Sequence, residues 1–311
     1  MGGKEKITRL KKPPGHHHHD RHRRKKHNWT KLLQNNKSLT VGSSFVGVGA
    51  ILVYVYLQLT RGQLHTFVSA LEHVTRAVYD VNCSKDYESE KFIECKPKRC
   101  ARVVRDGLIS EADAAYLLNV AKKGLAYGGS NGGASILDLH SGALSKGDIF
   151  INIYSLLKKD NIHLFTEEDF MVYKKTKDKI QHAIAEEFGI PINKLYLTKP
   201  TFFSRMNTTE AQTIHDEYWH AHIDKETYGS FHYTSLLYLT TYGQEFTGGR
   251  FIFIDPDKNR TVEPKLARVS FFTSGSENVH YVEKVEDGTR YAITISFTCD
   301  PEQAISEPSF S

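Results

Sequence analysis

Residues 218–224 read YWHAHID, a segment in which every second position from the third onward carries a potential metal ligand. Those positions are His220, His222 and Asp224. We interpret residues 218–223 as a short β-strand, on which alternate side chains point to the same side. The segment therefore predicts an imidazole and a carboxylate that face one surface together.

A further potential ligand lies much later in the chain. His280 stands in the segment NVHYV at 278–282, 58 residues after His222. Two histidines and one carboxylate form the facial triad of non-haem Fe(II) oxygenases, which leaves coordination positions open. From the residues alone, either Asp224 or His220 could pair with His222 and complete a site with His280.

An arginine follows ten residues after His280. Arg290 begins the apolar segment RYAITISF at 290–297. A cation that faces the interior of a β-barrel is costly to bury alone, whereas a bound carboxylate would pair with both arms of its guanidinium. The pattern thus indicates an anion site near the metal, and the alternative is a strand-end arginine in solvent.

The segments around these residues change from helical to strand-like in the second half of the chain. Ser110 and Thr166 are candidate N-caps of helices that run to about Lys123 and Phe188. Eight short apolar segments separated by turn residues then indicate a sandwich or jelly-roll barrel. We place these strands at about 195–205, 218–223, 232–240, 250–254, 261–263, 267–272, 279–285 and 290–298. Helices followed by strands predict an α+β fold, with helices covering one face of the barrel.

At this point the sequence resembles a known family. The matching residues are His222, Asp224, His280 and Arg290, together with GGRF at 248–251 and VSFF at 269–272. The pattern is similar to the 2-oxoglutarate and Fe(II)-dependent dioxygenases, in their prolyl 4-hydroxylase-like branch. The resemblance covers about residues 100–311. It implies a double-stranded β-helix (jelly-roll) catalytic domain at 101–311.

The resemblance also implies roles for individual side chains. It selects the His-x-Asp pair, so that His222, Asp224 and His280 would bind Fe(II). Arg290 would hold the distal carboxylate of 2-oxoglutarate. Tyr238, which lies on the strand after the His-x-Asp pair, is expected either to hydrogen-bond 2-oxoglutarate or to pack in the core. Collagen prolyl hydroxylases usually have a lysine where Arg290 stands, and this departure weakens any inference that the substrate is collagen.

The implied reaction consumes O2 and 2-oxoglutarate, releases succinate and CO2, and hydroxylates a substrate. The resemblance favours a protein side chain as substrate, prolyl or lysyl, and ascorbate as the agent that keeps the iron reduced. Lipid or sugar substrates stay open as alternatives. The barrel would keep the site dry and the cosubstrate oriented.

Charge is distributed unevenly along the 311 residues, whose formal net charge is +5. Residues 1–40 hold 12 Lys or Arg and two acids, whereas the remaining residues hold 29 basic and 34 acidic side chains. The chain is therefore a basic tail joined to a mildly acidic body. Such a tail indicates either a nucleic-acid contact or a segment that flanks a membrane.

An apolar stretch after the tail favours the membrane. No Asp, Glu, Lys or Arg occurs between Lys37 and Arg61. Within this gap, the 21 residues from Leu39 to Leu59 would span roughly 30 Å as a helix, which is the thickness of the hydrocarbon core of a bilayer. We predict a cytosolic tail at 1–38, which contacts anionic lipid, and a transmembrane helix at 39–60. A cleaved signal peptide is the alternative, although the tail is too long for a usual n-region. We expect no nucleic-acid partner.

Positive charge is denser before this stretch than after it, which predicts a lumenal body. The protein would be a single-pass type II membrane protein of the endoplasmic reticulum or Golgi. Glycosylation sequons begin at Asn82, Asn207 and Asn259. Apolar spacing over residues 61–80 predicts a stem helix, followed by a Cys-rich connector, so that 61–100 joins the span to the catalytic domain.

Four cysteines form an even set: Cys83, Cys95, Cys100 and Cys299. An oxidising lumen would favour two disulfides, in any of three connectivities. A zinc site built on the first three cysteines is an alternative that lacks paired CxxC spacing.

Two other functions fit parts of the pattern. The same topology describes many Golgi glycosyltransferases, and Asp255-Pro256-Asp257 imitates their metal-binding DxD, although a hairpin turn explains it better. A non-catalytic binding module on an oxygenase-like barrel is the second alternative. The glycine-rich loop at 124–133 could be a lid over the site or a simple turn.

Overall fold

The computed structural model describes residues 64–159, 162–213 and 216–308. Within these ranges no helix combines the length and the apolar character that crossing a bilayer requires. The tail predicted at 1–38 and the span predicted at 39–60 lie outside the described residues. The described residues all belong to one compact unit, which carries the barrel.

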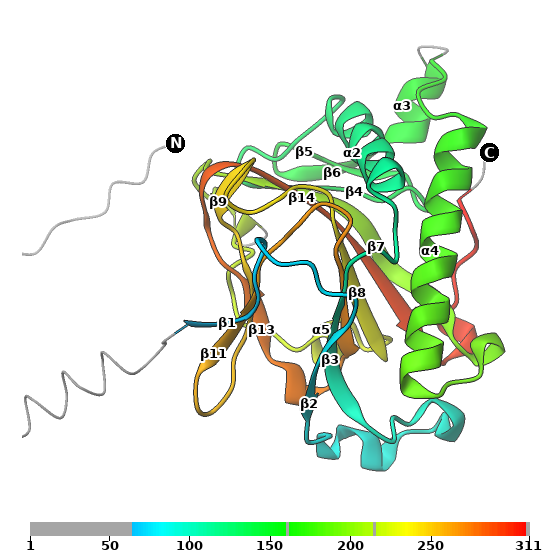
Figure 1. The fold of residues 1–311 in the computed structure, drawn as a ribbon. Helices are drawn as coiled ribbons and strands as arrows, with labels where there is room; N and C mark the ends of the chain where they lie inside the picture. The colour runs from blue at the N-terminus through cyan, green and yellow to red at the C-terminus, as the bar shows by residue number, and fades with distance from the viewer. Residues whose placement is uncertain (1–63, 160–161, 214–215, 309–311) are drawn as a thin grey trace, which may run out of the picture. The chain divides into compact units, whose positions relative to one another are not determined.

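Two β-sheets form the barrel (Figure 1). The small sheet has the order β1-β11-β10-β13, in which β1 pairs in parallel with β11 and the other pairs are antiparallel. Its strands are β1 (Leu64–Val68), β10 (Phe251–Phe253), β11 (Asn259–Val262) and β13 (His280–Val282). This short sheet carries His280 at the first residue of β13.

The large sheet has the order β2-β3-β12-β8-β14-β7-β4-β5-β6, and β9 pairs with the beginning of β14. Its strands are β2 (Ala77–Val81), β3 (Cys100–Arg105), β4 (Ala134–Leu137), β5 (Ala143–Lys146), β6 (Ile149–Asn152), β7 (Tyr196–Asn207), β8 (Tyr233–Tyr238), β9 (Phe246–Gly248), β12 (Val269–Thr273) and β14 (Val285–Thr298). The pairings of β14 with β7 and β8 lie at its centre, and both are antiparallel.

The central strands of the large sheet are buried on both faces. Leu236, Phe272 and Ala292 pack against apolar side chains of the small sheet. Their neighbours in sequence, Leu237 and Ile293 among them, belong to a second apolar cluster that includes the helices. Successive strand residues alternate between the two faces of the sheet. A segment such as VSFF at 269–272 therefore contributes side chains to both clusters. The result is a jelly-roll barrel with helices on its outer face, as the sequence predicts.

Both long helices begin and end near their predicted residues. Ser110 Oγ accepts a hydrogen bond from Asp113 N at 3.1 Å at the start of α2 (Glu111–Leu125). Thr166 and Asp169 form a capping box before α4 (Glu167–Phe188), and Gly189 ends that helix at φ 67°. The other helices are α3 (Ile153–Lys159), α5 (Asp224–Tyr228), and the 3-10 turns η1 (Lys85–Ser89), η2 (Ile93–Cys95), η3 (Ile192–Lys194), η5 (Ser276–Asn278) and η6 (Pro301–Gln303).

The stem helix predicted over 61–80 is wrong for the residues described. Strands β1 and β2 occupy this part of the chain and pair with β11 and β3. In the sequence, β11 lies far from β1, and the Cys-rich segment separates β2 from β3. Local apolar spacing therefore cannot reveal these pairings. Residues 64–100 therefore belong to the same compact unit as the barrel, and the domain begins before residue 101.

The strand predicted at 218–223 is also wrong. This segment forms turns, and α5 begins directly at Asp224. The remaining predicted strands appear as β7, β8, β10, β11, β12, β13 and β14 with shifted ends.

Two disulfides pair all four cysteines. Cys83 bonds to Cys100, and Cys95 bonds to Cys299. The zinc alternative for the first three cysteines is therefore wrong. The second disulfide ties the connector between β2 and β3 to the residue that follows β14. It joins the beginning of the domain to its end.

Candidate active site

Three side chains converge at the mouth of the barrel. One ligand atom from each of His222, Asp224 and His280 lies within 4.8 Å of the others, and no other such group occurs among the described residues. The Nε2 atoms of the two histidines lie 3.5 and 3.6 Å from Asp224 Oδ1. The structure thus brings together the residues predicted as the facial triad.

A single bridge between distant residues places the two imidazoles. His222 N donates to His280 O at 2.9 Å and His280 N donates to His222 O at 3.0 Å, so the rings lie 4.4 Å apart. Asp224 reaches the same point as the first residue of α5. His220 is exposed, and its Nε2 lies 2.8 Å from Glu217 Oε2 instead. The alternative pair of His220 and His222 is therefore not the one that meets His280.

Backbone carbonyls orient both imidazoles in the same way. His222 Nδ1 lies 3.0 Å from the carbonyl of His220, and His280 Nδ1 lies 2.9 Å from the carbonyl of Asn278. A carbonyl only accepts, so Nδ1 carries the proton in each ring and Nε2 offers its lone pair. Both Nε2 atoms face the carboxylate, which is the orientation that a shared metal ion requires.

Hydrogen bonds also orient Asp224. Thr234 Oγ1 donates to Asp224 Oδ2 at 2.6 Å, which leaves Oδ1 facing the imidazoles. Burial acts to raise the pKa of Asp224, but His280, His222 and Thr234 together lower it below its ordinary value. Burial lowers the pKa of His280, whereas for His222 the effect of burial is outweighed by Asp224, so that its pKa is raised. An ionised Asp224 and a neutral His280 are the states that bind metal.

Arg290 lies on β14 and is almost entirely buried, at 1% exposure. Its Nε and Nη2 have no hydrogen-bond partner among the described residues, and Nη1 only approaches Met206 Sδ at 3.6 Å. Burial lowers the pKa of this guanidinium. A buried and unpaired cation is costly, and an anion in this position would supply the missing acceptors.

One cavity of about 410 Å³ connects the triad to Arg290. Its lining also includes Tyr218, Thr234, Leu236, Phe251 and Thr294. Ile149 and Phe150 line it as well, and these two side chains are 62% and 58% exposed. A small molecule in this cavity can therefore touch the triad and the arginine at once.

Tyr238 is fully buried and packs in the core between the two sheets. Its hydroxyl lies 3.1 Å from Ser270 Oγ, and the Arg290 guanidinium lies 5.6 Å from its ring. These contacts match the expectation of a core tyrosine. Direct contact with 2-oxoglutarate stays a prediction.

Several residues shape the site although the sequence assigned their side chains no role in it. Tyr218 lines the cavity and accepts a hydrogen bond from Val285 N at 3.0 Å. Phe251 stacks on the His280 ring at 4.9 Å. Thr234 could have been noticed, because it stands on the strand that follows the His-x-Asp pair. Phe251 meets His280 through the pairing of β10 with β13, and Tyr218 contacts Val285 from a turn, so no local pattern reveals either contact.

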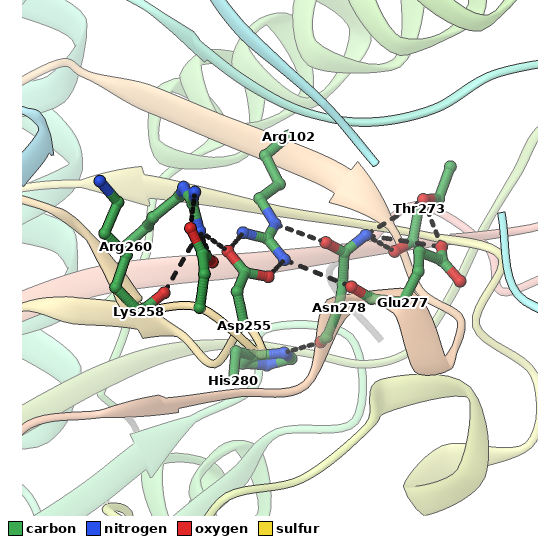
Figure 2. A network of polar contacts seen from close by, with 9 residues as sticks. Arg102, Asp255, Lys258, Arg260, Thr273, Glu277, Asn278 and His280 are labelled. Carbon is green, nitrogen blue, oxygen red and sulfur yellow. Dashed lines mark hydrogen bonds and ion pairs between the residues drawn. The ribbon is translucent and has the colours of Figure 1, made fainter. Parts of the chain in front are cut away.

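The remaining predicted sites fall elsewhere. Asn82 is exposed, whereas Asn207 and Asn259 are half-buried. Asp255 pairs with the buried Arg102 and with Arg260 (Figure 2). Asp257 also pairs with Arg260. The DxD imitation is therefore occupied by arginines, which disfavours the glycosyltransferase alternative.

Comparison with known proteins agrees with this geometry. Residues 202–298 match the family described as the 2OG-Fe(II) oxygenase superfamily. The 2-oxoglutarate and iron-dependent oxygenase domain-containing protein 3 of Homo sapiens is 53% identical, over 87% of this chain and 85% of that protein. Its Xenopus tropicalis counterpart is 58% identical, over 83% of this chain and 82% of that protein.

More distant matches were also found. Prolyl 3-hydroxylase 2 of Gallus gallus is 40% identical over 72 residues, which are 22% of this chain and 10% of that protein. A solved prolyl hydroxylase of Trichoplax adhaerens, in complex with a hypoxia inducible factor oxygen degradation domain peptide, matches with a TM-score of 0.44 and 16% identity. That match covers 65% of this chain and 85% of the other.

Proposed function

The chain belongs to the 2OG-Fe(II) oxygenase superfamily and is a 2-oxoglutarate-dependent dioxygenase, and from that premise we propose that it is anchored in a membrane and hydroxylates a protein side chain in the secretory pathway. Members of the superfamily use Fe(II), 2-oxoglutarate and O2, and ascorbate is typical of the prolyl hydroxylase branch. The observation that carries the catalytic part of the proposal is the shared cavity of the triad and the unpaired Arg290.

In this proposal His222, Asp224 and His280 hold the Fe(II). The donor set fits, because two imidazole Nε2 atoms and one carboxylate oxygen converge while both Nδ1 protons are held by carbonyls. When bound, the iron supplies the oxygen chemistry that couples decarboxylation of 2-oxoglutarate to hydroxylation. The chain itself orients the ligands and excludes water with Phe251 and the apolar wall.

Arg290 pairs with the distal carboxylate of 2-oxoglutarate. Its two unpartnered nitrogens can donate to the two oxygens of one carboxylate in a fork geometry. The other end of the cosubstrate then lies toward the triad, because both line one cavity. This arrangement fixes which end of the molecule meets the metal.

Exposed apolar side chains in the lining of the cavity support a protein substrate. Ile149 and Phe150 are exposed and line the cavity together with Pro200 and Phe202, a lining suited to an apolar side chain such as proline. The name of the prolyl 3-hydroxylase among the similar proteins favours the same class of substrate.

The proposed location rests on chemistry outside the site. Two disulfides are typical of proteins that fold in an oxidising compartment. The uncharged stretch at 39–60 has the length of a membrane span, and the lipid bilayer would be its partner. The catalytic unit would then be lumenal in the endoplasmic reticulum or Golgi, in type II topology.

Anaerobic titration of the full-length chain with Fe(II) and 2-oxoglutarate tests the site. We expect an optical absorption band that needs both components and is lost in His222→Ala. His220→Ala is the matched control, because His220 is a neighbouring exposed histidine outside the cluster. If the wild-type protein and His222→Ala behave alike, the proposal is wrong. Retention of the band without any succinate formation would favour the non-catalytic binding module.

Two further measurements address substrate and location. Mass spectrometry of secretory proteins from cells with and without the gene should find a mass gain of one oxygen atom that disappears in the knockout. If the body is lumenal, Asn82, the exposed sequon, should carry a glycan that an endoglycosidase removes and that Asn82→Gln prevents. No glycan on any of the three sequons would contradict the lumenal assignment.

A further inference from the structure

Arg102 is a buried cation that no part of the proposed chemistry uses. It lies on β3 with 1% exposure, and its guanidinium is fully engaged (Figure 2). Nη1 and Nη2 donate to the two oxygens of Asp255 at 2.7 and 2.6 Å. Nε donates to Asn278 Oδ1 at 2.7 Å, and Nη2 also reaches the carbonyl of Glu277 at 3.3 Å.

Asn278 relays this contact to the triad. Its Nδ2 donates to the carbonyl and Oγ1 of Thr273 at 2.7 and 3.1 Å, while its Oδ1 accepts from Arg102. The side chain of Asn278 is therefore held at both ends, and it is 1% exposed. The carbonyl of the same residue accepts the Nδ1 hydrogen bond of His280 at 2.9 Å. The position of that carbonyl sets the direction of His280 Nε2.

A second path connects Arg102 to the same imidazole. The guanidinium lies 4.2 Å from the centre of the Phe253 ring, and that ring packs edge-on against His280 at 6.3 Å. Arg102 thus contacts both the hydrogen-bonding partner and one aromatic neighbour of a single triad residue. Arg102 thus links three separate elements: β3, which carries it, β10, which carries Phe253, and the turn before β13, which carries Asn278.

We propose that Arg102 is a positioning residue for His280, acting through Asn278, an inference that rests on the proposed function because it takes His280 as an iron ligand. Partners of the second ring nitrogen orient metal-bound histidines, and their loss typically weakens metal binding about 10–100-fold. Here the partner is a backbone carbonyl, and Arg102 fixes the residue that carries it. Lysine cannot replace it, because a single ammonium cannot reach Asp255 and Asn278 with the fork geometry of arginine.

The chain offers a matched control in Arg260. This arginine is also buried, at 7% exposure, and pairs with the same Asp255 as well as with Asp257. Its hydrogen bonds go to these two carboxylates and to the carbonyl of Lys258, and its guanidinium lies over Tyr79 rather than Phe253. Arg260→Met should therefore reproduce the loss of an ion pair at Asp255 without disturbing His280.

Equilibrium binding of Fe(II) to the full-length chain under anaerobic conditions tests the inference. We expect Arg102→Met and Arg102→Lys to raise the Kd for Fe(II) about tenfold or more, and Arg260→Met to change it less than about threefold. The Kd for 2-oxoglutarate at saturating metal should change little, since Arg290 is untouched. Nitrogen NMR of labelled histidine in metal-free protein should show His280 protonated on Nδ1 in the wild type and a mixture of tautomers in Arg102→Met.

Asn278→Ala covers the case in which Arg102→Met does not fold. It removes the amide but leaves the ion pair of Arg102 with Asp255, and it should weaken Fe(II) binding to a similar extent. Equal Kd values in the Arg102, Asn278 and Arg260 variants, with tight binding by the wild type, would overturn this inference alone. Failure of the wild type to bind Fe(II) would overturn it together with the proposed function.

Discussion

Glu90 and Lys225 are 135 residues apart in sequence, yet Lys225 Nζ donates to the Glu90 carboxylate at 2.8 Å. Lys225 directly follows the triad residue Asp224. The same carboxylate lies 3.1 Å from Nε2 of His232, near the start of β8. Glu90 therefore contacts both ends of the segment 225–232. This segment joins Asp224 to Thr234, the residue that donates a hydrogen bond to the Asp224 carboxylate. The connector between β2 and β3 is part of the framework of the site.

This contact predicts a pH dependence of stability. Burial acts to raise the pKa of Glu90, but its bonds to His232 and Lys225 lower it far below its ordinary value. A carboxyl with a lowered folded-state pKa stabilises the fold fully above its unfolded pKa of about 4.3, and loses that contribution as the pH falls toward the folded value. Urea unfolding between pH 6 and 3 should therefore show the wild type losing more stability than Glu90→Gln, on the order of 1–2 kcal/mol at pH 3, because each pH unit below the unfolded pKa removes about 1.4 kcal/mol.

Glu94→Gln is the control for this measurement. Glu94 lies on the same connector, but its side chain is 61% exposed and its contact with Lys194 is 3.3 Å long. Exposed pairs of this kind contribute little, so its stability profile should follow that of the wild type. Parallel profiles for the wild type and Glu90→Gln would show that the Glu90 contacts contribute nothing to folding.

The two disulfides should differ in their contributions to stability. Cys83 and Cys100 are 17 residues apart, whereas Cys95 and Cys299 are 204 apart. In the chain-entropy description, loops of these lengths stabilise by about 3 and about 5 kcal/mol. Replacing the longer-range pair with serines should therefore lower the free energy of unfolding more than replacing the other pair. A larger loss from Cys83→Ser with Cys100→Ser would contradict this order, as measured by denaturant unfolding without reductant.

The contacts of Asp216 predict that the glycine-rich loop is held in place. Its carboxylate accepts hydrogen bonds from Ser130 Oγ and from Thr213 N, the latter at 3.0 Å. A Cβ at Gly132 would collide with the same carboxylate. The loop is thus fastened beside the cavity, and Asp216→Ala should increase cleavage at 128–133 about tenfold or more in limited proteolysis. Asp216→Asn keeps an acceptor and should lie between. Unchanged cleavage would mean that the loop is held by other contacts.

The triad could be predicted because chemistry restricts it to few residue types. Spacing leaves either His220 or Asp224 as the partner of His222, and the family resemblance selects Asp224. The structure brings His222, Asp224 and His280 together, but not through the predicted strand. A bridge to His280 and the start of α5 replace the expected alternation of side chains. Local periodicity carries no information about such long-range pairing.

The framework around the triad could not be predicted for the same reason. Arg102 is more than a hundred residues away from both Asp255 and Asn278 in the sequence, and each of the three alone is an ordinary polar residue. The region interpreted as a stem and connector supplies β1, β2 and the Glu90 contact. Their apolar residues fit a helix pattern, and only pairing with β11 and β3 makes them strands.

The burial of Arg290 without partners predicts that this side chain lowers the stability of the ligand-free protein while it serves to bind 2-oxoglutarate. Its guanidinium is buried without a full set of partners, whereas Arg268 is equally buried but bonds to both oxygens of Asp106 at 2.8 and 2.9 Å. Replacing a buried charge that lacks partners with an apolar side chain removes the cost of burying that charge, whereas breaking a complete buried pair costs about 3–5 kcal/mol. Without ligand, urea unfolding should therefore find Arg290→Met more stable than the wild type and Arg268→Met much less stable.

Saturating 2-oxoglutarate with Mn(II) should then stabilise the wild type by about 2.7 kcal/mol at a hundredfold excess over its Kd, and should leave the stability of Arg290→Met unchanged. A destabilised Arg290→Met that still responds to 2-oxoglutarate would mean that this arginine serves the fold and not the cosubstrate.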